Sequence, residues 1–257
     1  MRCLTPWIAA ALLLSLTPPA LAQPPSPQAP ASLAVAERGG GEWEEFVFVE
    51  DRFKVNFPGA PRVENTTWTS QYRYTLPARV YSASRGAERY LVTVVDYRGI
   101  GTLGAERSKA CPPGAETCIG NQDGRQGAVL GLGYWKMDVR GAMAFAIFTL
   151  LQRDTTLTDL TLQFQDLVEG YSLQLTNRDE SRTFAYVTMH ENRLYVFEGT
   201  TPKGSPDPAL FQGSVGFVDA AGNGIRYVDY YSNGIHGLRQ HEPPPARVGG
   251  VLPGAPN

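Results

Sequence analysis

Apolar and polar residues alternate along several short stretches of the chain, with the period of two that strands show. The clearest stretch is FKVNF at 53–57, which predicts a half-buried strand. The whole of Trp43–Phe57 predicts two strands joined by a turn at Glu50 and Asp51. Because the first of these strands mixes Phe with Val, it should be buried on both faces.

The same alternation recurs through the rest of the chain. After an irregular passage it predicts a hairpin made by 79–83 and 90–97. A last strand is predicted at 225–231. Between these regions the pattern predicts an antiparallel meander, with strands at 157–164, 171–175, 183–189 and 193–199.

Asp138–Gln152 (DVRGAMAFAIFTLLQ) is predicted to be the main helix. Asp138 is a residue type favoured at the N-cap, and Arg153 is a favourable cation at the other end. The apolar side chains leave little polar face, so the helix should be largely buried. Contact with lipid is the alternative, but the run is too short to span a bilayer, which needs about 20 residues.

A second helix should begin at Pro206, because proline is favoured at the first helical position. It would place Phe211, Val215 and Val218 on one face. Antiparallel strands with two separated helices predict an α+β fold. We expect an antiparallel β-sheet of about seven or eight strands, flanked by two main helices.

The two ends of the chain differ from this alternating middle. Residues 1–22 combine a basic start, a short apolar core and a small-x-small site, so we expect a signal peptide cleaved after Ala22 and a protein that is periplasmic or secreted. Residues 23–41 read as a Pro/Ala/Gly-rich linker, and 239–257 as a disordered Pro/Gly-rich tail. A single domain is therefore expected at 42–238.

Export leaves Cys111 and Cys118 as a pair, because Cys3 leaves with the signal peptide. In an oxidising compartment two cysteines this close predict a disulfide. A redox-active dithiol or a metal pair is the alternative, but the spacing is not C-x-x-C and no His lies nearby. The disulfide would pin the glycine-rich loop 99–134, where a short helix is expected only near 105–110. Such long connections are usually functional or disordered.

Charge and motifs exclude several kinds of site. A net charge of -2 without a basic cluster argues against nucleic acid. Residues 99–104 (GIGTLG) spell G-x-G-x-x-G, but dinucleotide binding needs a parallel β-α-β unit, so we expect a flexible loop and no cofactor. The three histidines have no metal-ligand spacing with acids, so no metal site is predicted. No catalytic residue is assigned.

One group of residues has the composition of a partner surface. Arginine and tyrosine are favoured anchors at binding surfaces, and they gather near the end of the last predicted strand. The residues are Arg226, Tyr227, Tyr230 and Tyr231. The alternative is ordinary strand composition, because tyrosine is a good strand former.

Two passages resemble a known family. Phe53–Pro61 (FKVNFPGAP) is similar to the opening strand and turn of many exported bacterial domains, and Leu194–Phe217 to their closing strand, loop and helix. The chain thereby resembles uncharacterised exported bacterial proteins with a PsbP/Mog1-like fold, over 42–231 apart from the loop 99–134. The resemblance implies a layered antiparallel sheet flanked by helices. Its known members mostly act as accessory or binding proteins, so it implies a non-enzyme.

These observations favour an exported, non-catalytic accessory or binding domain without a cofactor. Its partner would be an envelope or extracellular protein or a small ligand, and no membrane span would remain after signal cleavage. One alternative is an exported hydrolase built from dispersed acids such as Asp96, Asp154 and Glu198. Another is a carrier that holds a small ligand between the sheet and a helix.

Overall fold

The computed structural model describes residues 42–109 and 135–239. The predicted signal peptide and linker lie outside these residues, as do the predicted tail after Arg239, Cys111, Cys118 and most of the loop 99–134. Within the described residues, no helix is long and apolar enough to cross a membrane.

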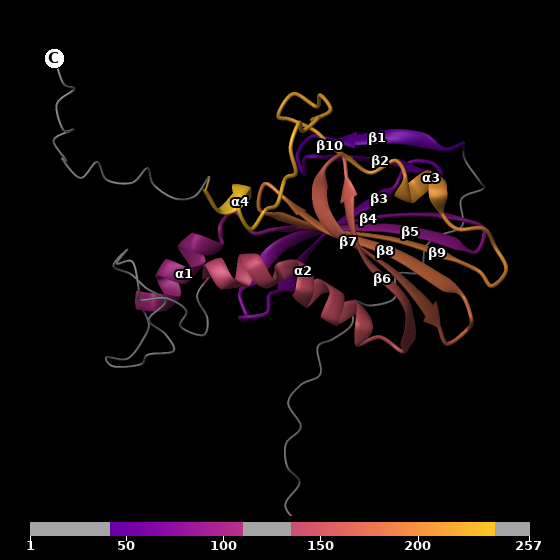
Figure 1. Cartoon of the computed structure of the whole chain (residues 1–257), viewed down its shortest axis with the longest axis horizontal. Coiled ribbons are helices and arrows are strands. Elements are labelled where there is room, and N and C mark those ends of the chain that lie inside the picture. The colour runs from indigo at the N-terminus through magenta and orange to yellow at the C-terminus, as the bar shows by residue number, and fades with distance from the viewer. Residues whose placement is uncertain (1–41, 110–134, 240–257) are drawn as a thin grey trace, which may run out of the picture. The chain divides into compact units, whose positions relative to one another are not determined.

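The described residues form two antiparallel sheets, as expected for the α+β class (Figure 1). The larger sheet has the order β3-β4-β5-β9-β8-β7-β6. Its strands are β3 (Arg62–Thr69), β4 (Thr75–Arg85), β5 (Glu88–Asp96), β6 (Thr155–Gln165), β7 (Val168–Asn177), β8 (Arg182–His190) and β9 (Arg193–Thr201). The predicted hairpin and meander are confirmed. Strand β3 was missed because its RVENTTWT sequence has few apolar residues and lies at an edge.

The smaller sheet has the order β1-β2-β10 and consists of β1 (Glu44–Phe48), β2 (Phe53–Phe57) and β10 (Gly216–Phe217). The half-buried pattern predicted for β2 is confirmed, because Phe53 and Phe57 are fully buried. Burial of β1 on both faces is wrong: Val47 is 44% exposed, since only one face of the small sheet is covered.

The helices are α1 (Ile100–Lys109), α2 (Trp135–Leu151), α3 (Ala209–Gln212) and α4 (His236–Arg239). The main helix exists, but it begins before Asp138, so the N-cap prediction for this residue is wrong. It is buried along one face only, and Phe148 on its other face is 55% exposed. The second predicted helix shrinks to the single turn of α3, because Gly213 follows it and Gly216 enters β10.

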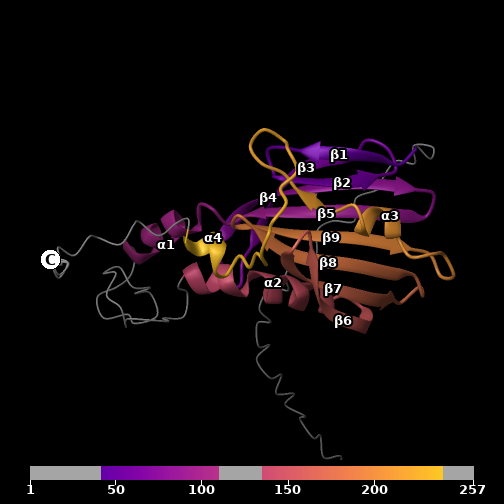
Figure 2. The same ribbon diagram turned by 45° about the horizontal axis from the view of Figure 1, so that its top comes forward.

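Two hydrophobic cores cover the two faces of the larger sheet. Helix α2 packs on one face, and the small sheet with α3 packs on the other (Figure 2). Strand β9 therefore alternates between the cores: Leu194 and Val196 lie under α2, while Tyr195 and Phe197 face the small sheet. This explains why the central strands are apolar on both faces.

The G-x-G-x-x-G motif does not form a flexible loop, because all of it after Gly99 lies in α1. An added Cβ on Gly104 would lie 2.8 Å from Cδ1 of Trp135, the first residue of α2. The sheet beside it is antiparallel. Glycine here is explained by the close approach of two helices.

Candidate functional site

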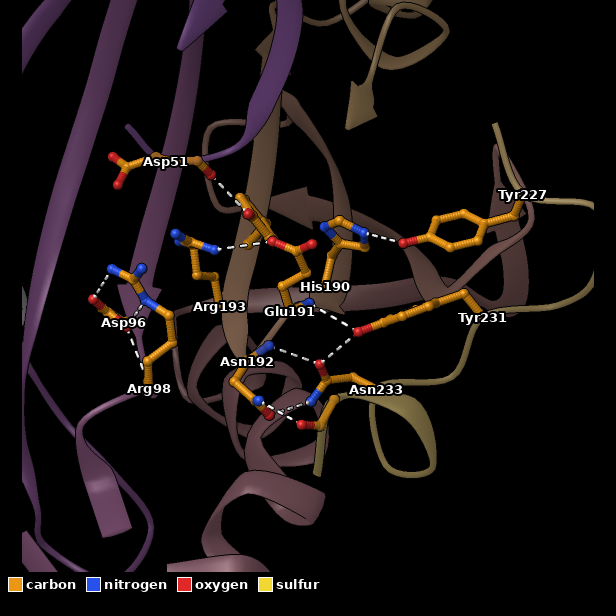
Figure 3. Close-up of polar contacts among 12 residues, drawn as sticks. Asp51, Asp96, Arg98, His190, Glu191, Asn192, Arg193, Tyr227, Tyr231 and Asn233 are labelled. Atoms are coloured by element: carbon orange, nitrogen blue, oxygen red, sulfur yellow. Dashed lines mark hydrogen bonds and ion pairs between the residues drawn. The ribbon is translucent and has the colours of Figure 1, made fainter. Parts of the chain in front are cut away.

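The last described residues, 225–239, run across the turn between β8 and β9 and are called the strap below (Figure 3). The prediction of a regular strand at 225–231 is wrong. Among the described residues, the strap makes one isolated bridge, between Val168 and Tyr231, and a second bridge, just before the strap, joins Val218 to Gly224. The Tyr231 amide donates to the Leu167 carbonyl at 2.9 Å, and the Glu169 amide donates to the Tyr231 carbonyl at 2.9 Å.

The β8–β9 turn forms several hydrogen bonds with the strap. Its central residues Glu191 and Asn192 have φ of 47° and 56°, the left-handed values of a tight hairpin turn. The Glu191 amide donates to the Tyr231 hydroxyl at 2.9 Å, and the Asn192 amide donates to Oδ1 of Asn233 at 2.8 Å. The Asn192 side chain also donates to the Gly237 carbonyl at 2.7 Å. These bonds satisfy the turn's buried polar groups from a distant part of the chain.

His190 lies beneath the strap and is fully buried. Its Nε2 is 2.6 Å from the Tyr227 hydroxyl, and its ring centroid is 4.3 Å from that of Phe217 and 5.0 Å from that of Tyr231 (Figure 3). Burial, and then the charge of Arg193, lowers the pKa of His190 from 6.5 to about 3. The imidazole is therefore neutral at ordinary pH.

The four residues predicted as a partner surface do not share one face. Tyr231 is buried and Tyr227 half-buried, and both contact His190. Arg226 and Tyr230 are exposed. Tyr230 is 66% exposed, and its ring centroid lies 4.6 Å from that of Phe164 in β6.

Among the described strands, β6 lies at an edge of the larger sheet, and it exposes an apolar row. The row comprises Leu157 (39% exposed), Leu160 (46%), Leu162 (51%) and Phe164 (40%). In the β6–β7 register, Leu160 lies opposite Leu173 and Leu157 lies opposite Leu175, and both partners belong to the core under α2. The exposed row therefore extends that core beyond the part that α2 covers. We call the row, together with Tyr230, the β6 surface. The alternation predicted this strand, but not that its apolar side is uncovered.

The acids considered for a hydrolase are held apart in ion pairs. Oδ2 of Asp96 lies 2.6 Å from the Arg98 guanidinium, Glu198 is paired with Arg153, and Asp154 is paired with Arg178. Burial acts to raise the pKa of Asp96, but the hydrogen bonds and charge of Arg98 outweigh it and lower the pKa.

Register shows how far apart two of these acids lie. Asp96 lies opposite Arg193, and Glu198 lies further along the same strand β9. The rise of a strand therefore places the two residues about 16 Å apart along β9. This is longer than the separation of about 10 Å or less that an acid–base pair needs.

A buried carboxylate in α2 was not expected from the sequence. The Ser70 hydroxyl donates to Asp138, and the Tyr74 amide donates to the Ser70 hydroxyl at 3.0 Å. Burial raises the pKa of Asp138, although the Ser70 hydrogen bond opposes this. The group ties α2 to the turn before β4 and is closed to solvent. Among the described residues, no group of three or more His, Cys, Asp or Glu could hold a metal ion.

No protein-family model matches the chain, and no curated protein matches it. Among solved structures, the chain is similar to cyanobacterial PsbP (CyanoP) from Synechocystis sp. PCC 6803, determined in solution. The identity is 13%, the match covers 72% of this chain and 97% of that chain, and the TM-score is 0.39.

Proposed function

We propose that this chain is an exported, non-catalytic accessory or binding domain that takes up an extended segment of a partner protein along β6. The observation that carries the proposal is the exposed apolar row on an edge strand of 11 residues. The expectation of export rests on residues 1–22.

An edge strand presents unpaired backbone N–H and C=O groups that can pair with another strand. Proteins protect such edges with lysine, proline or short strands. Strand β6 (TTLTDLTLQFQ) contains neither lysine nor proline, and its one charged residue is Asp159. Its edge is therefore open to strand addition, the mode in which backbone bonds supply affinity and alternate side chains supply specificity.

The chemistry of the β6 surface defines the partner segment. Leu160, Leu162 and Phe164 lie on one side, so the partner should carry apolar residues at every second position. Asp159 lies on the other side of the strand, where its carboxylate accepts from the Thr161 hydroxyl at 3.0 Å. A polar or basic residue in the partner would suit this position. Tyr230 extends the apolar side beyond the end of the strand.

The test uses synthetic peptides and the mature protein, which should begin at Gln23 when it is recovered from its host. One nine-residue peptide alternates Leu with Thr, and a second has the same composition in scrambled order. The alternating peptide should bind and perturb the NMR signals of β6 amides. L160K/L162K should weaken this binding at least about tenfold, because a charge in the apolar row costs more than about 1.4 kcal/mol.

The matched control is V63K, because Val63 is 50% exposed on β3, the opposite edge of the same sheet. V63K should leave peptide binding unchanged. Equal binding of the two peptides, or equal loss with V63K and L160K/L162K, would count against strand addition at β6.

A further inference from the structure

We infer that the strap is an acid-released element, held on the β8–β9 turn only while the imidazole of His190 is neutral. This inference goes beyond the proposed function and does not depend on it. It rests on the position of His190, which is buried between the larger sheet and the strap.

The contacts of His190 leave no place for a second proton. Its Nε2 already faces the Tyr227 hydroxyl at 2.6 Å, whereas Nδ1 has no hydrogen-bond partner among the described residues. A protonated imidazole is a donor at both nitrogens. The new N–H would be buried in a ring that packs against Phe217 and Tyr231, and Nδ1 has no acceptor within hydrogen-bond distance among the described residues.

The charged groups around His190 also oppose its protonation. Arg193 of β9 and Arg52 of the β1–β2 turn are the cations that act on the imidazole. Glu191 is the nearby acid on the turn, but it forms an ion pair with Arg193 at 3.5 Å. From the strap, the titratable neighbours are the hydroxyls of Tyr227 and Tyr231. A positive charge on His190 therefore meets two like charges and no free acid.

Release of the strap would relieve this conflict by exposing His190 to water. The bonds that resist release include two backbone bonds at Tyr231, the bond from the Glu191 amide to the Tyr231 hydroxyl, the contact of His190 with Tyr227, and the side-chain bonds of Asn192 and Asn233. With a pKa of about 3 when covered and 6.5 when exposed, the open population should rise about 30-fold between pH 7.5 and pH 5.0. Release would uncover Phe217 and detach the Tyr230 ring from Phe164.

Hydrogen exchange of the full chain tests this inference. The reporters are the amides that the strap covers or contributes, at Glu169, Glu191, Asn192 and Tyr231. Their protection factors, corrected for intrinsic exchange, should fall about 30-fold from pH 7.5 to pH 5.0. They should also stay less protected than the amides of β5, because opening is local.

Two substitutions at the buried site and one control separate the possible causes. H190F keeps an aromatic ring and H190Q keeps a polar group, and each should abolish the pH dependence of the reporters. H236Q removes the exposed histidine of the strap, whose ring stacks on Tyr231, and should leave the dependence intact. Protection that is independent of pH in the wild type, persistence of the dependence in H190F and H190Q, or reporters as protected as β5 would each overturn the inference.

Discussion

Replacing Phe53 by alanine should test whether the small sheet stabilises the whole domain. Phe53 opens β2 and is fully buried between the two sheets. Its ring lies 4.8 Å from that of Phe48 and 5.1 Å from that of Tyr81. It also lies 5.9 Å from Tyr195 and 5.8 Å from Phe197, which belong to the larger sheet.

The expected loss of stability follows from this burial. Burying about 200 Å² of aromatic surface at about 25 cal/mol per Å² stabilises by about 5 kcal/mol. A compact unfolded chain lowers this figure by about 10–40%, and the retained Cβ of alanine lowers it further. The cavity and the lost edge-to-face contacts act in the opposite direction. We therefore expect F53A to lower the free energy of unfolding by about 3–4 kcal/mol.

Urea denaturation followed by circular dichroism measures this change, with F148A as the matched control. Phe148 is 55% exposed on α2, so its removal should cost less than about 0.5 kcal/mol. A loss below about 1 kcal/mol in F53A would show that the core between the sheets does not form as described. Equal losses in the two variants would lead to the same conclusion.

Two further predictions concern the helices. G104A should destabilise the protein by about 1–3 kcal/mol, because its Cβ would overlap Trp135. G101A should be neutral or stabilising, because its Cβ would lie 3.6 Å from the same indole, which is an ordinary contact distance. Thermal melts compare the two variants. D138N should make the protein more stable at pH 7. Burial raises the pKa of Asp138 above 3.8, so the wild type loses stability as pH rises from 3.8 through the pKa of the folded state, whereas the uncharged Asn avoids this loss. Urea denaturation from pH 4 to pH 7 should show the difference from wild type growing with pH, and a constant difference would contradict this reasoning.

The strands could be predicted because their alternation directly reflects burial on one face. FKVNF reads correctly as β2 for this reason. The order of strands in the sheet leaves no such mark. Strands β6 and β7 both show the alternation, but β7 lies between two strands of the sheet whereas β6 pairs with β7 alone. The position of each strand in the sheet therefore decides which leucines stay exposed. Strand β3 shows the converse: an edge position tolerates a polar sequence that gives no strand signal.

The polar groups of the site were harder to predict than the strands. Asp138 has the residue type of an N-cap, and local preference alone placed it there. Its actual partner, Ser70, comes from a turn far away in the sequence. In the same way, the tyrosines of the strap fit a strand equally well until His190 is known to lie beneath them. Side chains that act across long sequence separations carry no local pattern.

The strap and the β6 surface share Tyr230, whose ring contacts that of Phe164. This contact connects the two proposals thermodynamically. A segment bound to β6 that also packs on Tyr230 would favour the closed strap. Strap opening would then weaken the binding of the segment by the same factor by which the bound segment disfavours opening, so protonation of His190 would weaken binding. A segment bound only along Leu160 and Leu162 would gain nothing from the closed strap and would be insensitive to acid. The pH dependence of binding would thus reveal how far along the β6 surface the partner extends.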